Sequence, residues 1–104
     1  QKQFSTFFAL MEEVAMDIKW TELYNAAKAV QNDREISDKV WAGGVAAAIE
    51  SESGRIYVGV CVDTCSSLGI CAERNAIFHA VQEGEREIIA IAIVGGPQYT
   101  IKEY

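Results

Sequence analysis

The chain has 104 residues and a mass of 11.4 kDa, and half of its residues are apolar, which predicts one domain, residues 1–104, with a single core. It contains no run of eighteen apolar residues, and Glu12, Glu13 and Asp17 stand in its N-terminal stretch, so we expect neither a membrane span nor a signal peptide. Nine Lys and Arg against fifteen Asp and Glu give a formal net charge of -6, which repels phosphate backbones and argues against nucleic acid as a partner.

The first half of the chain predicts helical structure followed by a hairpin. Apolar residues at three- and four-residue spacing predict helical structure from about Ser5 to Val30. The polar stretch Gln31–Lys39 predicts a loop, which Gly43-Gly44 ends. The runs Val45–Ile49 and Ile56–Val60 then predict the two strands of an antiparallel hairpin.

The second half predicts a loop, a helix and a strand. Val62–Ile70 is rich in loop-forming residues, and Cys71–Glu83 has helical spacing closed by Gly84 as a C-terminal cap. The apolar run Ile88–Val94 predicts a buried and parallel strand. Together these elements predict an α/β domain with a mixed central sheet and a core of about 42–95, which Gly95–Tyr104 is too short to complete.

A thiol and a carboxylate stand two residues apart where the predicted loop gives way to the helix, at Cys71 and Glu73. The helix dipole favours a thiolate at that position, and Zn²⁺ binds ionised sulfur. A carboxylate beside a zinc-bound water can take its proton and pass it on. The spacing alone is also typical of a small packed cysteine, so both interpretations stand at this point.

The remaining metal-binding side chains leave alternatives open. Three cysteines cannot form a complete disulfide framework, and in a chain expected to be cytoplasmic they more often serve a metal, catalysis or the core. Cys61, Cys65 and Cys71 could form a three-thiolate site, although separations of four and six fit one tetrahedral centre poorly; pocket lining for Cys61 and a loop role for Cys65 are the alternatives. His79 lies more than two helical turns from Cys71, so we expect a packed or exposed helix residue and not a ligand.

Several stretches together resemble the cytidine deaminases over about half of the chain. They are Gly59–Asp63, Gly69–Gly84 and Ile89–Val94, and the upstream Val45–Ile49 and Gly54–Gly59 match that family's first hairpin. The resemblance implies a three-layer α/β/α fold. It also implies a zinc-dependent hydrolytic deaminase, in which zinc-activated water attacks an amidine-like ring carbon and a glutamate serves as general acid and base.

By this resemblance Cys71 is a Zn²⁺ ligand and Glu73 is the catalytic acid and base. Arg74 either orients a neighbouring ligand or is an ordinary solvated helix residue. Cys61 and Asp63 stand where the family has an Asn-x-Glu pair that holds the ribose hydroxyls, so they are the candidate substrate contacts.

The expected substrate is a small aminopyrimidine such as cytidine or deoxycytidine. Gly43 matches the position of the family's base-stacking aromatic residue, so that contact is missing. Blasticidin S deaminase, a relative that also lacks part of the ribose pattern, shows that this catalytic core can serve another aminopyrimidine.

The family takes two more zinc ligands from a Pro-Cys-x-x-Cys turn, and no such turn follows Val94. Because Tyr99–Tyr104 resembles the family's distal C-terminal segment, we expect the fold to be incomplete at its C-terminal end, with a segment missing between Gln98 and Tyr99 and a long Cα separation there. The family's assembly predicts a homodimer or homotetramer. The alternative function is a metal-free, inactive deaminase-fold module that binds or oligomerises.

Overall fold

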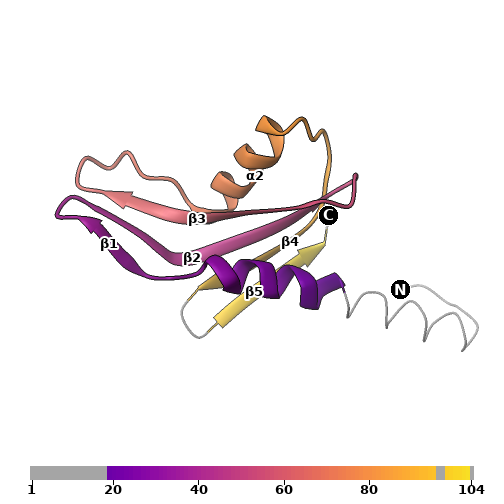
Figure 1. The fold of residues 1–104 in the computed structure, drawn as a ribbon, viewed down its shortest axis with the longest axis horizontal. Coiled ribbons are helices and arrows are strands. Elements are labelled where there is room, and N and C mark those ends of the chain that lie inside the picture. The colour runs from indigo at the N-terminus through magenta and orange to yellow at the C-terminus, as the bar shows by residue number, and fades with distance from the viewer. Residues whose placement is uncertain (1–18, 96–97, 104) are drawn as a thin grey trace, which may run out of the picture.

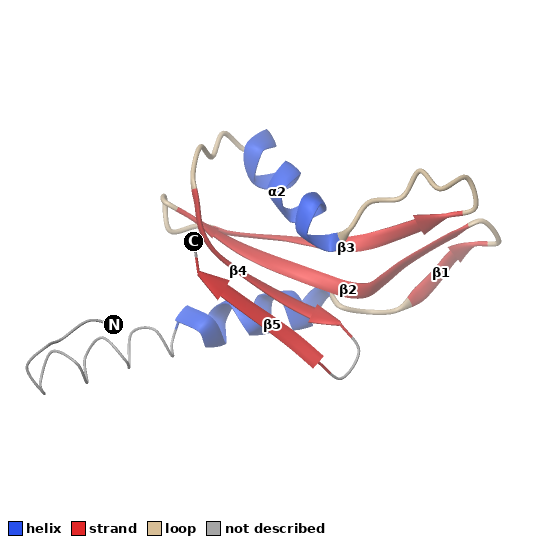
Figure 2. Cartoon of the chain, turned by 180° about the vertical axis from the view of Figure 1, so that it is seen from behind, coloured by secondary structure: helices blue, strands red, loops and turns tan. Residues whose placement is uncertain are grey.

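A computed structural model describes residues 19–95 and 98–103 of the chain (Figures 1 and 2). Its elements are a helix over residues 19–30, β1 (Arg34–Ser37), β2 (Val40–Ser51), β3 (Ile56–Thr64), α2 (Ala72–Gln82), β4 (Ile88–Gly95) and β5 (Gln98–Glu103). The first part of the predicted N-terminal helical stretch lies outside the described residues. Among the described helices, none is long and apolar enough to cross a membrane.

The sheet is built around β2, which is its longest strand. β3 pairs with one edge of β2, whereas β1 and β4 pair with successive parts of the other edge, and β5 pairs with β4. The predicted hairpin is therefore present, with both strands longer than the apolar runs that predicted it.

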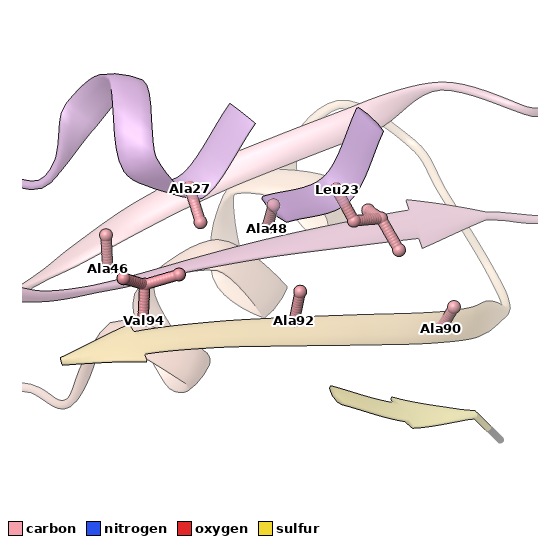
Figure 3. Close-up of a cluster of buried hydrophobic side chains, with 7 residues drawn as sticks. All are labelled: Leu23, Ala27, Ala46, Ala48, Ala90, Ala92 and Val94. Atoms are coloured by element: carbon pink, nitrogen blue, oxygen red, sulfur yellow. The ribbon is translucent and has the colours of Figure 1, made fainter. Parts of the chain in front are cut away.

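Helices cover the two faces of this sheet, as Figure 1 shows, because successive side chains of a strand point to opposite faces. On one face, Ala46 and Ala48 of β2 pack with Leu23 of the N-terminal helix and with alternate residues of β4; Figure 3 shows this cluster. On the other face, Ala47 and Ile49 pack with alanines of α2. The predicted three-layer α/β/α fold is confirmed.

The boundaries of α2 follow from its end residues. Cys71 is the N-cap, with φ -76° and ψ 158°, and Glu83 is the C-cap. Gly84 follows with φ +94°, the left-handed conformation in which glycine commonly ends helices. The predicted helix and its glycine cap are confirmed.

A close approach between backbones places α2 against β3. A Cβ atom added to Gly59 would collide with the backbone nitrogen of Ala76, so only glycine allows the helix to lie this near the strand. Asn75 Nδ2 donates a hydrogen bond to Val60 O at 3.0 Å, and His79 Nδ1 lies 3.3 Å from Val58 O. These contacts give α2 a fixed position beside the free edge of β3.

The pairing expected for Ile88–Val94 is wrong. β4 contains this run, but it pairs antiparallel with β2 and with β5. β3 and β4 are both antiparallel to β2, so they run parallel to each other with β2 between them. The run is apolar throughout because both faces of β4 contribute to the core, which is a property that parallel strands share.

The loop predicted over Gln31–Lys39 is also wrong in part, since it contains β1. All four residues of β1 are exposed, so the strand has no buried face to give an alternating apolar pattern. Gly43-Gly44 does not precede the strand. It lies inside β2, where the register with β3 shifts between Ala42 and Ala46.

The long separation expected between Gln98 and Tyr99 is not found. The two residues are consecutive in β5, where they pair with Gly95 and Val94 of β4. The expectation rests on the resemblance of Tyr99–Tyr104 to the family's distal segment, but in the structure this segment continues directly from Gln98 as a strand. β5 itself covers one edge of β4.

We predict that Gly59→Ala lowers the free energy of unfolding by about 1–3 kcal/mol, because the new methyl group overpacks a contact between two backbones. Gly44→Ala is the control, since a Cβ there meets the Asp33 side chain only at an ordinary 3.5 Å. Urea unfolding monitored by circular dichroism measures both. Equal stability of the two variants would contradict the close approach.

Candidate active site

The loop after β3 folds back on that strand and delivers the start of α2 to it, as Figure 2 shows. Thr64 Oγ1 accepts a hydrogen bond from Leu68 N at 3.0 Å, and Val62 and Ile70 exchange two backbone hydrogen bonds of 2.9 Å each. Gly69 is needed for this return, because a Cβ there would collide with Val62 O. The chain therefore enters α2 directly beside β3.

A cleft of about 580 Å³ lies between this loop, β3 and the start of α2. Its volume is in the range of pockets that hold small molecules. The lining residues are Val45, Cys61, Asp63, Thr64, Ser67, Gly69, Ile70, Cys71 and Arg74.

The structure brings together three of the four predicted site residues. Cys61, Asp63 and Cys71 all line the cleft. Glu73 does not: it is half-buried on the first turn of α2, and no hydrogen bond or ion pair joins it to another described residue. A part for Glu73 in the chemistry of this cleft would therefore require its side chain to turn toward the cleft.

The two cysteines of the cleft have different surroundings. Cys71 is exposed, and as the N-cap of α2 it makes no side-chain capping hydrogen bond. Cys61 is half-buried, and its Sγ accepts a hydrogen bond from Val45 N at 3.3 Å. The register shift in β2 directs this N–H to sulfur and not to the β3 backbone.

The three-cysteine alternative is wrong, because Cys65 lies outside the cleft, in the turn after β3, where its backbone N–H bonds Lys39 O. No group of three or more His, Cys, Asp or Glu side chains that could hold a metal occurs in the described part of the chain. His79 is an exposed helix residue in edge contact with the Tyr57 ring, as the spacing predicted.

Sequence reasoning missed an aromatic side chain beside the cleft. Trp41 pairs directly with Asp63 across β2 and β3, so the two side chains point to the same face of the sheet, and Trp41 is 38% exposed. Alignment to the family placed Gly43 at the aromatic position, two residues further on. Only the pairing register, which the bulge in β2 sets, could have identified Trp41.

Arg74 lines the cleft and also lies over an aromatic ring. Its Cζ is 5.6 Å from the centroid of Phe78, one helical turn along α2. This cation–π contact holds the guanidinium beside Phe78, and Arg74 brings a positive charge to a cleft that Asp63 also lines.

A polar cluster at the far end of α2 holds the other end of the helix to the sheet. Tyr57 and Ser53 each donate a hydrogen bond of 2.7 Å to Glu85 Oε2. The Tyr57 hydroxyl, followed by Ser53, lowers the pKa of Glu85 below its ordinary value of 4.5. The same Glu85 carboxylate raises the pKa of Tyr57.

Nearby, a hydrogen bond with Glu87 and repulsion from it raise the pKa of Glu52.

The comparisons with known proteins point to one family, although no family model matches the chain. The chain is 41% identical over 51 residues to a cytidine deaminase of Halalkalibacterium halodurans, an alignment that covers 48% of this chain and 39% of that protein. The structure of a cytidine deaminase from Burkholderia pseudomallei is similar over 75% of this chain and 62% of that one, with a TM-score of 0.61 and 35% identity. That of a cytidine deaminase from Mycobacterium leprae is similar over 72% and 62%, with a TM-score of 0.59 and 28% identity.

Sequence and fold thus agree: the chain is similar in both to cytidine deaminases, and these similarities support membership of the cytidine deaminase superfamily. It spans about two fifths of the length of the curated relatives that it matches and 62% of the solved structures.

We predict that Glu85→Gln removes a pH-dependent part of the stability. Because the pKa of Glu85 is lowered in the folded state, its contribution is fully present above the ordinary value of 4.5 and is lost as the pH falls through the lowered value. The raised pKa of Glu52 acts with the opposite sign, so the wild type alone does not isolate the effect of Glu85.

The measurement is the melting temperature of the wild type and of Glu85→Gln between pH 7 and acid. The variant should melt lower at neutral pH, and the difference should shrink in acid. Glu83→Gln, which removes an exposed carboxylate from the same helix end, is the control and should show no such convergence. A constant difference for Glu85→Gln at all pH values would contradict the account.

Proposed function

We propose that the chain carries a zinc-dependent hydrolytic deaminase site for a small aminopyrimidine such as cytidine or deoxycytidine. The observation that carries the proposal is the cleft at the start of α2, which is lined by Cys61, Asp63 and Cys71. The named relatives are cytidine deaminases, and the similarity to them extends through sequence and fold. Three free thiols among the described residues suit the reducing cytoplasm, where we propose that the protein acts.

The cleft offers contacts suited to a nucleoside. Asp63 is a carboxylate acceptor for sugar hydroxyls, and Cys61 beside it presents a weak donor. Trp41, on the same sheet face, supplies an aromatic surface on which a pyrimidine ring can stack. The guanidinium of Arg74 can bond a carbonyl oxygen of the base.

Hydrolytic deamination adds water to the ring carbon that carries the amino group and then breaks the carbon–nitrogen bond to release ammonia. In our proposal Glu73 takes a proton from the attacking water and delivers it to the leaving nitrogen. Its side chain has to turn from its half-buried position toward the bound substrate. Catalytic contacts often form only once substrate is bound.

The zinc centre that the family resemblance implies does not fit the described residues as a complete site. A catalytic Zn²⁺ normally takes three ligands from protein, and no group of three suitable side chains occurs among the residues that the structure describes. Cys71 is the donor that we assign to the metal. This shortfall favours the second candidate function, a metal-free deaminase-fold module that binds a small molecule or another chain.

We predict that Glu73→Gln retains bound zinc and loses about 10²–10⁴-fold in turnover, because a general acid and base lowers the barrier without holding the ion. Cys71→Ala should lose the bound zinc and the turnover, since it removes a ligand from the coordination shell. Zinc content by elemental analysis and ammonia release from cytidine and deoxycytidine measure the two properties. Glu83→Gln is the matched control on the same helix.

Bound zinc with near-normal turnover in Glu73→Gln would contradict the assignment of Glu73. A wild-type chain that holds no zinc and releases no ammonia would refute the deaminase proposal. If that same chain bound cytidine, the result would support the second candidate function, a metal-free binding module.

We further propose that the chain forms a homodimer or homotetramer through the outer face of α2. Phe78 and Val81 are 49% and 61% exposed on this helix, an unusual position for two large apolar side chains one turn apart. A second copy of the chain would bury them and could complete each cleft.

We predict that light scattering finds an oligomer and that Val81→Asp shifts it toward monomer, because the new carboxylate would be buried unpaired. Ile36→Asp, at an equally exposed position on β1, is the control and should leave the assembly unchanged. A monomeric wild type at high concentration would contradict the proposal.

A further inference from the structure

The backbone register places Cys61 and Cys71 opposite each other. Val62 and Ile70 form an antiparallel bridge in which each donates to the other, so the next pair outward is Cys61 with Cys71, at a position that lacks hydrogen bonds. Cα atoms at such positions are about 4.5 Å apart, and the two side chains point to the same face. Disulfides span Cα separations of about 4.4–6.8 Å.

The side chains agree with this register. Both cysteines line the same cleft, and Cys61 packs against the cluster that contains Ala72, the residue after Cys71. Cys71 can stand opposite Cys61 because its backbone is still extended, with ψ 158°, before the helix begins. Both thiols are free in the structure.

The two thiols differ in exposure, which indicates that Cys71 reacts first with a reagent in solution and Cys61 second. Cys71 is exposed and makes no capping hydrogen bond, so a reagent in solution can reach its sulfur. Cys61 is half-buried behind it, held by the hydrogen bond from Val45 N to its Sγ. Cys65 is exposed but does not line the cleft, and its backbone N–H bonds Lys39 O in the turn after β3.

We propose that Cys61 and Cys71 are a redox-active dithiol that a small-molecule disulfide oxidises to an intramolecular disulfide across the mouth of the cleft. The Cys71 thiolate attacks one sulfur of the reagent, whose disulfide bond breaks and releases one thiolate. The Cys61 thiolate then attacks Cys71 Sγ and expels the second thiolate. Two electrons pass from the protein to the reagent, and the two protons of the cysteines leave with the released thiols or to solvent.

The disulfide would close the site to its proposed chemistry. The formation of the disulfide does not depend on the proposed function, but its consequence does. Once oxidised, Cys71 can no longer bind a metal and Cys61 can no longer contact a substrate. Oxidation and metal binding at Cys71 are then mutually exclusive. Where disulfides form in a reducing compartment, they are usually transient and serve catalysis or redox sensing.

The test equilibrates the full chain with mixtures of reduced and oxidised glutathione, quenches in acid and measures intact mass. Each single Cys→Ser variant leaves one possible internal disulfide: Cys65→Ser leaves only Cys61–Cys71, Cys71→Ser only Cys61–Cys65, and Cys61→Ser only Cys65–Cys71. We expect the disulfide of Cys65→Ser to form with an equilibrium constant at least tenfold above the other two, which is about 30 mV for a two-electron couple.

A second measurement needs no variant. Cleavage of the oxidised wild type before Asp63 separates Cys61 from the other two cysteines, so the linked peptides and their fragmentation identify its partner. Linkage of Cys61 to Cys71 supports the proposal, whereas linkage to Cys65, or equal constants in the three variants, overturns it. Zn²⁺ should slow oxidation of Cys65→Ser; if it does not while the disulfide still forms, the zinc assignment fails and the dithiol stands.

Discussion

The absence of a side chain at Gly59 is the constraint on which the rest of the structure depends. It lets the backbone of α2 come into contact with β3 at Ala76, five residues after the N-cap of the helix. The alanines of α2 extend this close packing across β2, and Asn75 bonds the exposed edge of β3. A larger residue at position 59 would lift the helix and move the cleft with it.

The same closeness determines the chemistry that the cleft can offer. Because α2 starts beside β3, its N-cap Cys71 faces a residue of that strand, and the loop from Thr64 to Ile70 has only to turn back once. Two thiols, a carboxylate and a guanidinium from β3 and from the start of α2 then share one cleft. The pairing that brings Cys71 to its site as a candidate ligand also brings Cys61 to it as a candidate disulfide partner.

Much of this could be predicted from the sequence, where the signals were local. Helix α2 follows from apolar spacing and from Gly84, and the hairpin follows from two apolar runs around a turn. The prediction that Cys61, Asp63 and Cys71 share one site came from the family resemblance. The structure places all three in the cleft, although their roles remain proposals.

What could not be predicted depends on register and on contacts between distant residues. β1 has no buried face, so its sequence is indistinguishable from that of a polar loop. The direction of β4 depends on which strand it joins, and its apolar sequence suits either direction. Trp41 lies opposite Asp63 because of a bulge, and Glu73 is half-buried and does not line the cleft; neither leaves a pattern in the sequence.

The function that we propose requires the cleft at the start of α2 to bind an aminopyrimidine nucleoside. The most direct measurement is a titration of the isotope-labelled chain with cytidine, followed by the chemical shifts of its backbone amides. The account predicts saturable shifts at Cys61, Asp63, Cys71 and Arg74, with none at Glu83 and Gly84 at the other end of the helix. Shifts confined to that other end, or no shifts at millimolar cytidine, would contradict it.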